Sequence, residues 1–172
     1  VICLFSDHGD HLGDHTAWQK ESYFDAAAHV PFLMSWPARF LEDEVRDELV
    51  CLTDLFGIAT HVAGETDTRD GIDLIGVLEG SAPKRDHLIG YYGEPGTNHF
   101  KIMVRDDRWK YIYLSNGGRE QLFDMAADPN ELVNVAGESP SVVGALRTAG
   151  TEACRHPGAA DALEGGELKS FA

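Results

Sequence analysis

The chain has 172 residues, with 29 Asp and Glu side chains against 14 Lys and Arg, and its formal net charge is −15 at pH 7. This negative charge argues against a protein that binds nucleic acid or an anionic membrane surface, because both attract positive charge. Hydrophobic residues make up 43% of the chain, which is enough for a core without disulfides. No apolar run approaches the ~20 residues of a membrane span.

The cysteines are Cys3, Cys51 and Cys154, an odd number without a C-x-x-C pair. This pattern predicts reduced thiols and argues against a disulfide framework or a structural zinc site. Reduced thiols favour a cytoplasmic protein, while a periplasmic or secreted one stays open. The chain begins without Met and inside a strand-like run, which we interpret as the sign of a fragment.

The first half of the sequence alternates short strand patterns with short helix patterns. Residues 1–5 form a continuous apolar run, which predicts a strand buried on both faces of an α/β sheet. Residues 54–63 carry apolar side chains at helical spacing, and Gly64 is suited to end that helix. The other elements expected here are a helix over 22–28, a strand over 30–37 and a short helix over 72–80.

From residue 87 the pattern changes to strand-like segments separated by turn residues, which predicts an antiparallel meander. A closing helix is expected after Ser139, with Pro140 in its first turn. The Gly- and Ala-rich tail from His156 is expected to fray. The change of pattern predicts two domains, 1–85 and 86–172. The expected strands of the meander cover 87–93, 99–107, 108–114 and 120–125.

The stretch FSDHGDHLGDH, residues 5–15, places three aspartates and three histidines directly after the first predicted strand. In open α/β sheets, ligands collect beyond the carboxyl ends of the strands. Asp7 offers a carboxylate oxygen, His8 offers an imidazole nitrogen, and Gly9 allows a sharp turn beside a bound ion. The stretch therefore predicts a divalent-metal site at Asp7 and His8. An Asx-type turn with a surface histidine is the alternative.

A longer string, SDHGDHLGDHTAWQKESYFDAAAHVPFLMSWP, closely resembles the sulfatase family of the alkaline phosphatase superfamily. Further segments resemble that family in the same order along the chain, up to about Gly137: LTDLFGIATHVAG, GIDLIGVLEG and IMVRDDRWKYIYLSNGGREQLFDMAADPNELVNVAG. The resemblance implies an α/β fold class. We expect the C-terminal part of an alkaline-phosphatase-like sulfatase fold, followed by a small antiparallel β-sheet with a packed helix.

The resemblance implies that the intact protein hydrolyses a small-molecule sulfate ester. The family's nucleophile, a Cys or Ser of C/S-x-P-x-R that is converted to formylglycine, has no counterpart in the chain and is expected in a missing N-terminal half. The chain would then supply part of the metal and sulfate site and be inactive alone. A phosphonate monoester or phosphodiester hydrolase of the same superfamily and a non-catalytic domain are the alternatives. Oligomeric state, including a homo-oligomer, stays open.

The resemblance also implies roles for single residues. Asp7 and His8 match the family's metal pair, with calcium favoured for sulfatases and manganese or magnesium as alternatives. Lys20, 13 positions after Asp7, matches the family's lysine and would be both catalytic and substrate-binding. A solvated surface lysine is the alternative. His15 would be a catalytic-site residue that contacts the substrate or supports a residue that does, and a residue that only caps the loop is the alternative.

The loop over residues 92–100 is the most unusual one of the second half. In the family the C-terminal subdomain lends residues to the substrate pocket, so Glu94 and His99 would select the alcohol part of the ester. A plain turn before a strand is the alternative. Asp10 and His11, in the first loop, are expected to be solvated.

Overall fold

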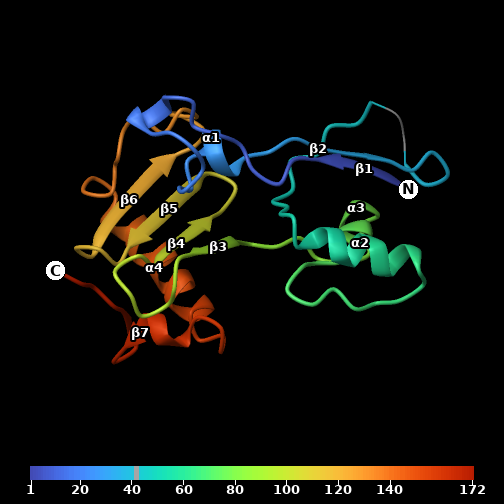
Figure 1. Cartoon of the computed structure of the whole chain (residues 1–172). Coiled ribbons are helices and arrows are strands. Elements are labelled where there is room, and N and C mark those ends of the chain that lie inside the picture. Colours follow the sequence, from blue (N-terminus) through green and yellow to red (C-terminus); the bar gives the residue numbers. More distant parts are fainter. Residues whose placement is uncertain (41–42) are drawn as a thin grey trace. The chain divides into compact units, whose positions relative to one another are not determined.

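The chain divides into two units, Val1–Asp86 and His87–Ala172, in a computed structural model that describes residues 1–40 and 43–172 (Figure 1). The boundary expected from the sequence lies after residue 85. In the described part of the chain, no helix has the length and apolar character needed to cross a membrane.

The first unit contains a two-stranded antiparallel sheet of β1 (Ile2–Phe5) and β2 (Phe32–Ser35). Both strands were expected, but burial of the first on both faces is wrong. Cys3 and Met34, which pair across the sheet, pack on the helices, whereas Ile2 and Leu4 on the opposite face are 72% and 66% exposed. The reason is that the helices of this unit supply apolar side chains to one face only.

The helices of the first unit are α1 (Asp25–Ala28), α2 (Asp54–Val62) and α3 (Leu74–Leu78). As predicted, the second helix ends before Gly64, whose φ of +81° is the left-handed conformation that glycine tolerates. The first helix begins later than expected, at Asp25. Ile58 of α2 and Leu74 and Ile75 of α3 form the small core on which the sheet packs.

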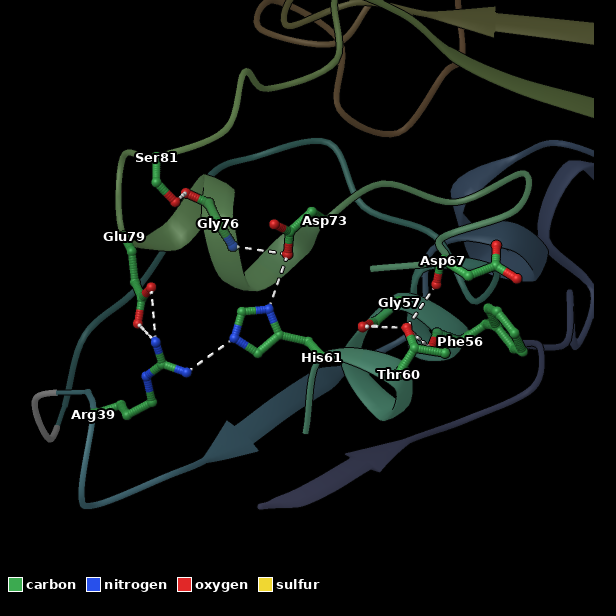
Figure 2. A network of polar contacts seen from close by, with 10 residues as sticks. All are labelled: Arg39, Phe56, Gly57, Thr60, His61, Asp67, Asp73, Gly76, Glu79 and Ser81. Atoms are coloured by element: carbon green, nitrogen blue, oxygen red, sulfur yellow. Dashed lines mark hydrogen bonds and ion pairs between the residues drawn. The ribbon is translucent and has the colours of Figure 1, made fainter. Parts of the chain in front are cut away.

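Polar contacts connect the end of β2 to the two longer helices (Figure 2). Arg39 Nη2 lies 2.7 Å from Glu79 Oε1, and Arg39 Nη1 lies 2.9 Å from His61 Nε2. His61 Nδ1 lies 3.4 Å from Asp73 Oδ1, and the same carboxylate oxygen caps α3 by accepting a hydrogen bond from Gly76 N at 3.0 Å. The network therefore stabilises the packing of α2 on α3.

A buried carboxylate at the start of α2 accepts hydrogen bonds from the segments before and after the helix. Asp54, at the first position of the helix, accepts hydrogen bonds from both Nη atoms of Arg85 at 2.7 and 2.8 Å. It also accepts from the main-chain nitrogens of Cys51 and Ile72. Since a buried charge is tolerated only when it is paired and hydrogen-bonded, these contacts explain how Asp54 lies inside.

The second unit is built on the predicted antiparallel meander, with strand order β3-β4-β5-β6. The predicted closing helix is α4 (Pro140–Ala153), which packs on one face of this sheet (Figure 1). Alternate strand residues supply the core, because successive side chains point to opposite faces. The strands are β3 (Leu88–Tyr92), β4 (Lys101–Arg105), β5 (Trp109–Leu114) and β6 (Arg119–Asp124).

The C-terminal tail is ordered, so the expectation that it frays from His156 is wrong. A 3-10 turn at Ala160–Ala162 leads into a hairpin of β7 (Leu163–Glu164) and β8 (Glu167–Leu168). Phe171 then exchanges hydrogen bonds with the turn after β5: its main-chain nitrogen donates to Ser115 O at 2.8 Å, and its carbonyl accepts from Gly117 N at 2.7 Å. These long-range main-chain bonds stabilise the tail.

Candidate active site

The turn that follows β1 carries the two residues predicted to bind a metal. Asp7 Oδ1 accepts a hydrogen bond from the main-chain nitrogen of His8 at 3.0 Å. This hydrogen bond, together with the positive charge of Lys20, lowers the pKa of Asp7. The carboxylate is exposed and ionised at neutral pH, as a ligand for a hard cation must be.

The ring of His8 is held in one tautomer. His8 Nδ1 lies 2.7 Å from the carbonyl oxygen of Gly9. Because a carbonyl oxygen can only accept, Nδ1 carries the hydrogen, and the lone pair of the neutral ring is on Nε2. Nε2 lies 3.5 Å from Asp7 Oδ2. The imidazole therefore presents its lone pair beside the carboxylate, which is the orientation that a metal-ligating histidine needs.

Lys20 lies at the same place, although it is 12 positions from His8 in the sequence. Its ammonium nitrogen is 2.5 Å from His8 Nε2 and donates to that lone pair. A neutral imidazole nitrogen has one lone pair, so Nε2 binds either this ammonium or a cation. The structure thus brings together all three residues, Asp7, His8 and Lys20, which the sequence singled out for metal and sulfate.

Gly9 is required for a reason that the sequence did not indicate. A Cβ atom at this position would lie 2.1 Å from the carbonyl oxygen of Ala26. Its main-chain nitrogen donates to Ala27 O at 2.9 Å. Glycine here lets the loop lie directly on α1, and it follows that the turn carrying Asp7 and His8 is attached to that helix.

Two histidines of the same loop lie in an aromatic cluster with Phe24. The His15 ring stacks on Phe24 with centroids 3.8 Å apart. His11 contacts both rings edge-on, with centroid distances of 6.3 Å to His15 and 6.0 Å to Phe24. His11 is only 2% exposed, so the expectation that it is solvated is wrong. A polar residue inside a loop gives no periodic signal of burial, which is why the sequence missed it.

Glu94 and His99 lie in the second unit, in the loop between β3 and β4. Both are exposed. The loop turns through Thr97, whose main-chain nitrogen and hydroxyl both donate to Glu94 O, at 3.2 and 2.8 Å. Because the two residues belong to a different unit from Asp7, His8 and Lys20, their part in the same site stays a prediction.

The donor set of the first turn fits part of a divalent-cation site. One carboxylate and one imidazole suit calcium, magnesium or manganese, but calcium takes about 6–8 ligands. Across residues 1–40 and 43–172, no three His, Cys, Asp or Glu side chains gather as a metal centre. A cation held at Asp7 and His8 would therefore take its remaining ligands from water, substrate or other protein groups.

Comparison with known proteins identifies the family. Residues 13–147 match the family model described as N-sulphoglucosamine sulphohydrolase, C-terminal. The chain is 32% identical over 145 residues to a choline-sulfatase of Rhizobium meliloti, covering 81% of this chain and 27% of that protein. It is 31% identical over 159 residues to human (Homo sapiens) arylsulfatase K, covering 85% of this chain and 29% of that protein. It thus spans less than a third of these relatives.

Solved structures agree on the fold. The chain is similar to a 2-O GAG sulfatase with a TM-score of 0.76 and 24% identity, over 98% of this chain and 38% of that one. It is also similar to the phosphonate monoester hydrolase of Agrobacterium radiobacter, with a TM-score of 0.65 and 25% identity, over 84% of this chain and 32% of that one. The chain has the alkaline-phosphatase-like fold of these enzymes, belongs to the sulfatase family and matches its C-terminal portion.

Proposed function

We propose that the intact protein containing this chain hydrolyses sulfate esters, and that Asp7, His8 and Lys20 form part of its metal and sulfate site. The observation that carries the proposal is the convergence of the three side chains after β1, with Lys20 Nζ 2.5 Å from His8 Nε2. The proposal is supported by the match to sulfatases over most of the chain.

The metal part of the proposal rests on Asp7 and His8. Asp7 would supply an anionic oxygen, and the Nδ1 hydrogen bond to Gly9 O keeps His8 Nε2 available as a nitrogen donor. A divalent cation bound here, calcium in the first place, would neutralise negative charge on the oxygens of the ester. Lys20 donates to the lone pair of His8 Nε2, so a cation held by His8 would leave the ammonium available to the ester.

Lys20 would act on the sulfate group itself. Cleavage of a sulfate ester spreads negative charge over the sulfuryl oxygens and the departing alcohol oxygen. A fixed ammonium group beside these oxygens stabilises the transition state more than the ground state, where the charge is less developed on the leaving side. The nucleophile, a formylglycine, would come from outside this chain. Glu94 and His99 are proposed to contact the alcohol part of the ester. His15 is proposed to contact the substrate or to support the loop that carries Lys20.

A phosphonate monoester hydrolase is the second candidate. The similarity to the Agrobacterium radiobacter enzyme favours it, and a carboxylate, an imidazole and an ammonium serve both chemistries because both substrates are tetrahedral anions with spread charge. Parallel assays of the intact protein with 4-nitrophenyl sulfate and a 4-nitrophenyl phosphonate monoester separate the two by their kcat/KM values. If the protein hydrolyses neither ester, the result would favour the third possibility, a non-catalytic protein.

The test of the site is Lys20→Ala in the intact protein. Removing a charge that acts in the transition state is expected to lower kcat/KM by about 10²–10³-fold. Lys84→Ala, which removes another exposed lysine of the same unit, is the control and is expected to retain activity. A Lys20→Ala variant with the activity of the control would remove Lys20 from the site.

Asp7→Asn tests the metal site. The amide keeps the size of the side chain but loses its charge, so the affinity for calcium and manganese is expected to fall by at least about tenfold. Isothermal titration calorimetry measures this directly. Unchanged affinity would show that the ion is held elsewhere in the protein.

A further inference from the structure

His11 is the buried anchor of the loop that carries Lys20. Of residues 9–24, all of which the structure describes, His11 is the only one that is buried. Neighbouring side chains such as Leu12 and Trp18 are exposed. His11 is therefore the side chain of this loop that lies deepest in the protein.

Hydrogen bonds of His11 bracket Lys20 on both sides. The His11 main-chain nitrogen donates to Gln19 O at 2.8 Å, directly before Lys20. Its ring nitrogen Nε2 lies 2.6 Å from Ser22 Oγ, two residues after Lys20. Ser22 N in turn donates to Lys20 O at 2.8 Å. The backbone of Lys20 is thus fixed between two contacts of one buried residue.

The loop needs such an anchor because its backbone is strained. Residues with side chains adopt a positive φ at four positions between 12 and 19, a conformation that is uncommon outside glycine. Such conformations persist when surrounding contacts hold them. The positions are Leu12 (φ +49°), His15 (φ +53°), Thr16 (φ +57°) and Gln19 (φ +67°).

The hydrogen bonding of the His11 ring indicates that its Nε2 contact is the reason for a polar side chain at this buried position. His11 Nδ1 is buried and has no hydrogen-bond partner. A buried polar atom without a partner is unfavourable for folding, and an apolar side chain of similar size would avoid this penalty. The polar contact that the imidazole does make is the one to Ser22.

We propose that His11 is a positioning residue, which holds Lys20 against His8 through its hydrogen bonds to Gln19 and Ser22. His11 is too deeply buried to touch a substrate, so it acts through Lys20. The proposal rests on the function proposed for Lys20 where activity is concerned, whereas the position of Lys20 beside His8 can be measured independently.

The first test is spectroscopic and uses the intact protein, selectively labelled with 15N-histidine and without added metal. The Nε2 resonance of His8 reports whether the Lys20 ammonium lies beside it, and Lys20→Ala supplies the reference for its absence. His11→Leu and Ser22→Ala are expected to move this resonance toward the Lys20→Ala value. His11→Gln, whose amide can still reach Ser22, is expected to keep it near the wild-type value.

The matched control is His29→Leu, which removes an exposed histidine of the same unit and is expected to leave the His8 resonance unchanged. A wild-type resonance in Ser22→Ala would overturn the proposal even if His11→Leu failed to fold. Loss of the Lys20 contact in His11→Gln to the same extent as in His11→Leu would also overturn it, because the effect would then follow from the ring and not from its hydrogen bond.

The second test is a double-mutant cycle on 4-nitrophenyl sulfate hydrolysis. His11→Leu alone is expected to lower kcat by about 10–100-fold, the effect of a misplaced catalytic group. In a Lys20→Ala background the same change is expected to cause no further loss. An equal loss in both backgrounds would overturn the positioning role. A fully active Lys20→Ala variant would instead refute the proposed function, while the His8 resonance would still test the positioning.

Discussion

The most demanding prediction concerns a buried ion pair in the second unit. Lys110 Nζ of β5 lies 2.7 Å from Glu131 Oε1, and both side chains are only 2% exposed. Neutralising one member leaves the other charge in a low-dielectric interior, whereas replacing both with apolar groups removes both desolvation penalties. Glu131→Gln is therefore expected to lower the free energy of unfolding by about 3–5 kcal/mol.

The double variant Lys110→Met/Glu131→Leu is expected to be about as stable as the wild type, within roughly 1 kcal/mol, because apolar replacement of a buried pair is often neutral. Glu152→Gln is the matched control. It neutralises a glutamate whose ion pair with Arg155 is exposed, so a change of less than about 1 kcal/mol is expected.

Urea denaturation of the chain, followed by tryptophan fluorescence, measures these changes. Trp109 adjoins Lys110 and is the one tryptophan of the second unit, so a Trp18→Phe/Trp36→Phe background isolates the unfolding of that unit. A Glu131→Gln variant no less stable than Glu152→Gln would refute the reasoning. The reasoning would also be refuted if the double variant lost as much stability as Lys110→Met and Glu131→Leu lose together when measured singly, because the two groups would then act independently.

Two further predictions concern the two units separately. Burial alone would raise the pKa of Glu120, but the hydrogen bonds from Arg147 and Tyr111 outweigh it and the pKa lies below its ordinary value of 4.5. The ionised carboxylate therefore stabilises the fold above that pH, and this contribution is lost as the pH falls below it. Between about pH 5 and pH 3, a range that spans the ordinary pKa of a glutamate, Glu120→Gln is expected to lose less stability than the wild type. Urea midpoints that fall equally in both proteins over this range would contradict the prediction. Asp73→Ala removes the cap of α3 and is expected to lower the free energy of unfolding of the first unit by about 1 kcal/mol. Urea denaturation followed by the fluorescence of Trp36 measures this change. An unchanged urea midpoint would show that the cap contributes nothing.

Much of the secondary structure could be predicted from the sequence because its signals are local. The apolar spacing over 54–63 and the position of Gly64 specify α2, and strand patterns with intervening turns specify the meander. The sequence also singled out the three residues proposed for the site, and their roles in binding metal and sulfate stay predictions. Asp7, His8 and Lys20 stand at a spacing that the sulfatase resemblance singles out, and they meet in the structure.

The sequence by itself thus indicated the family and the main helices and strands up to the closing helix, and it singled out the three residues proposed for the site. Tertiary structure alone decided burial, because burial depends on contacts between residues far apart in the chain. Examples are His11, whose ring meets Ser22, and Asp54, which meets Arg85 31 positions later. The ordered tail and the exposed face of β1 have the same cause: a short apolar or polar segment carries no local signal of which surface, if any, will cover it.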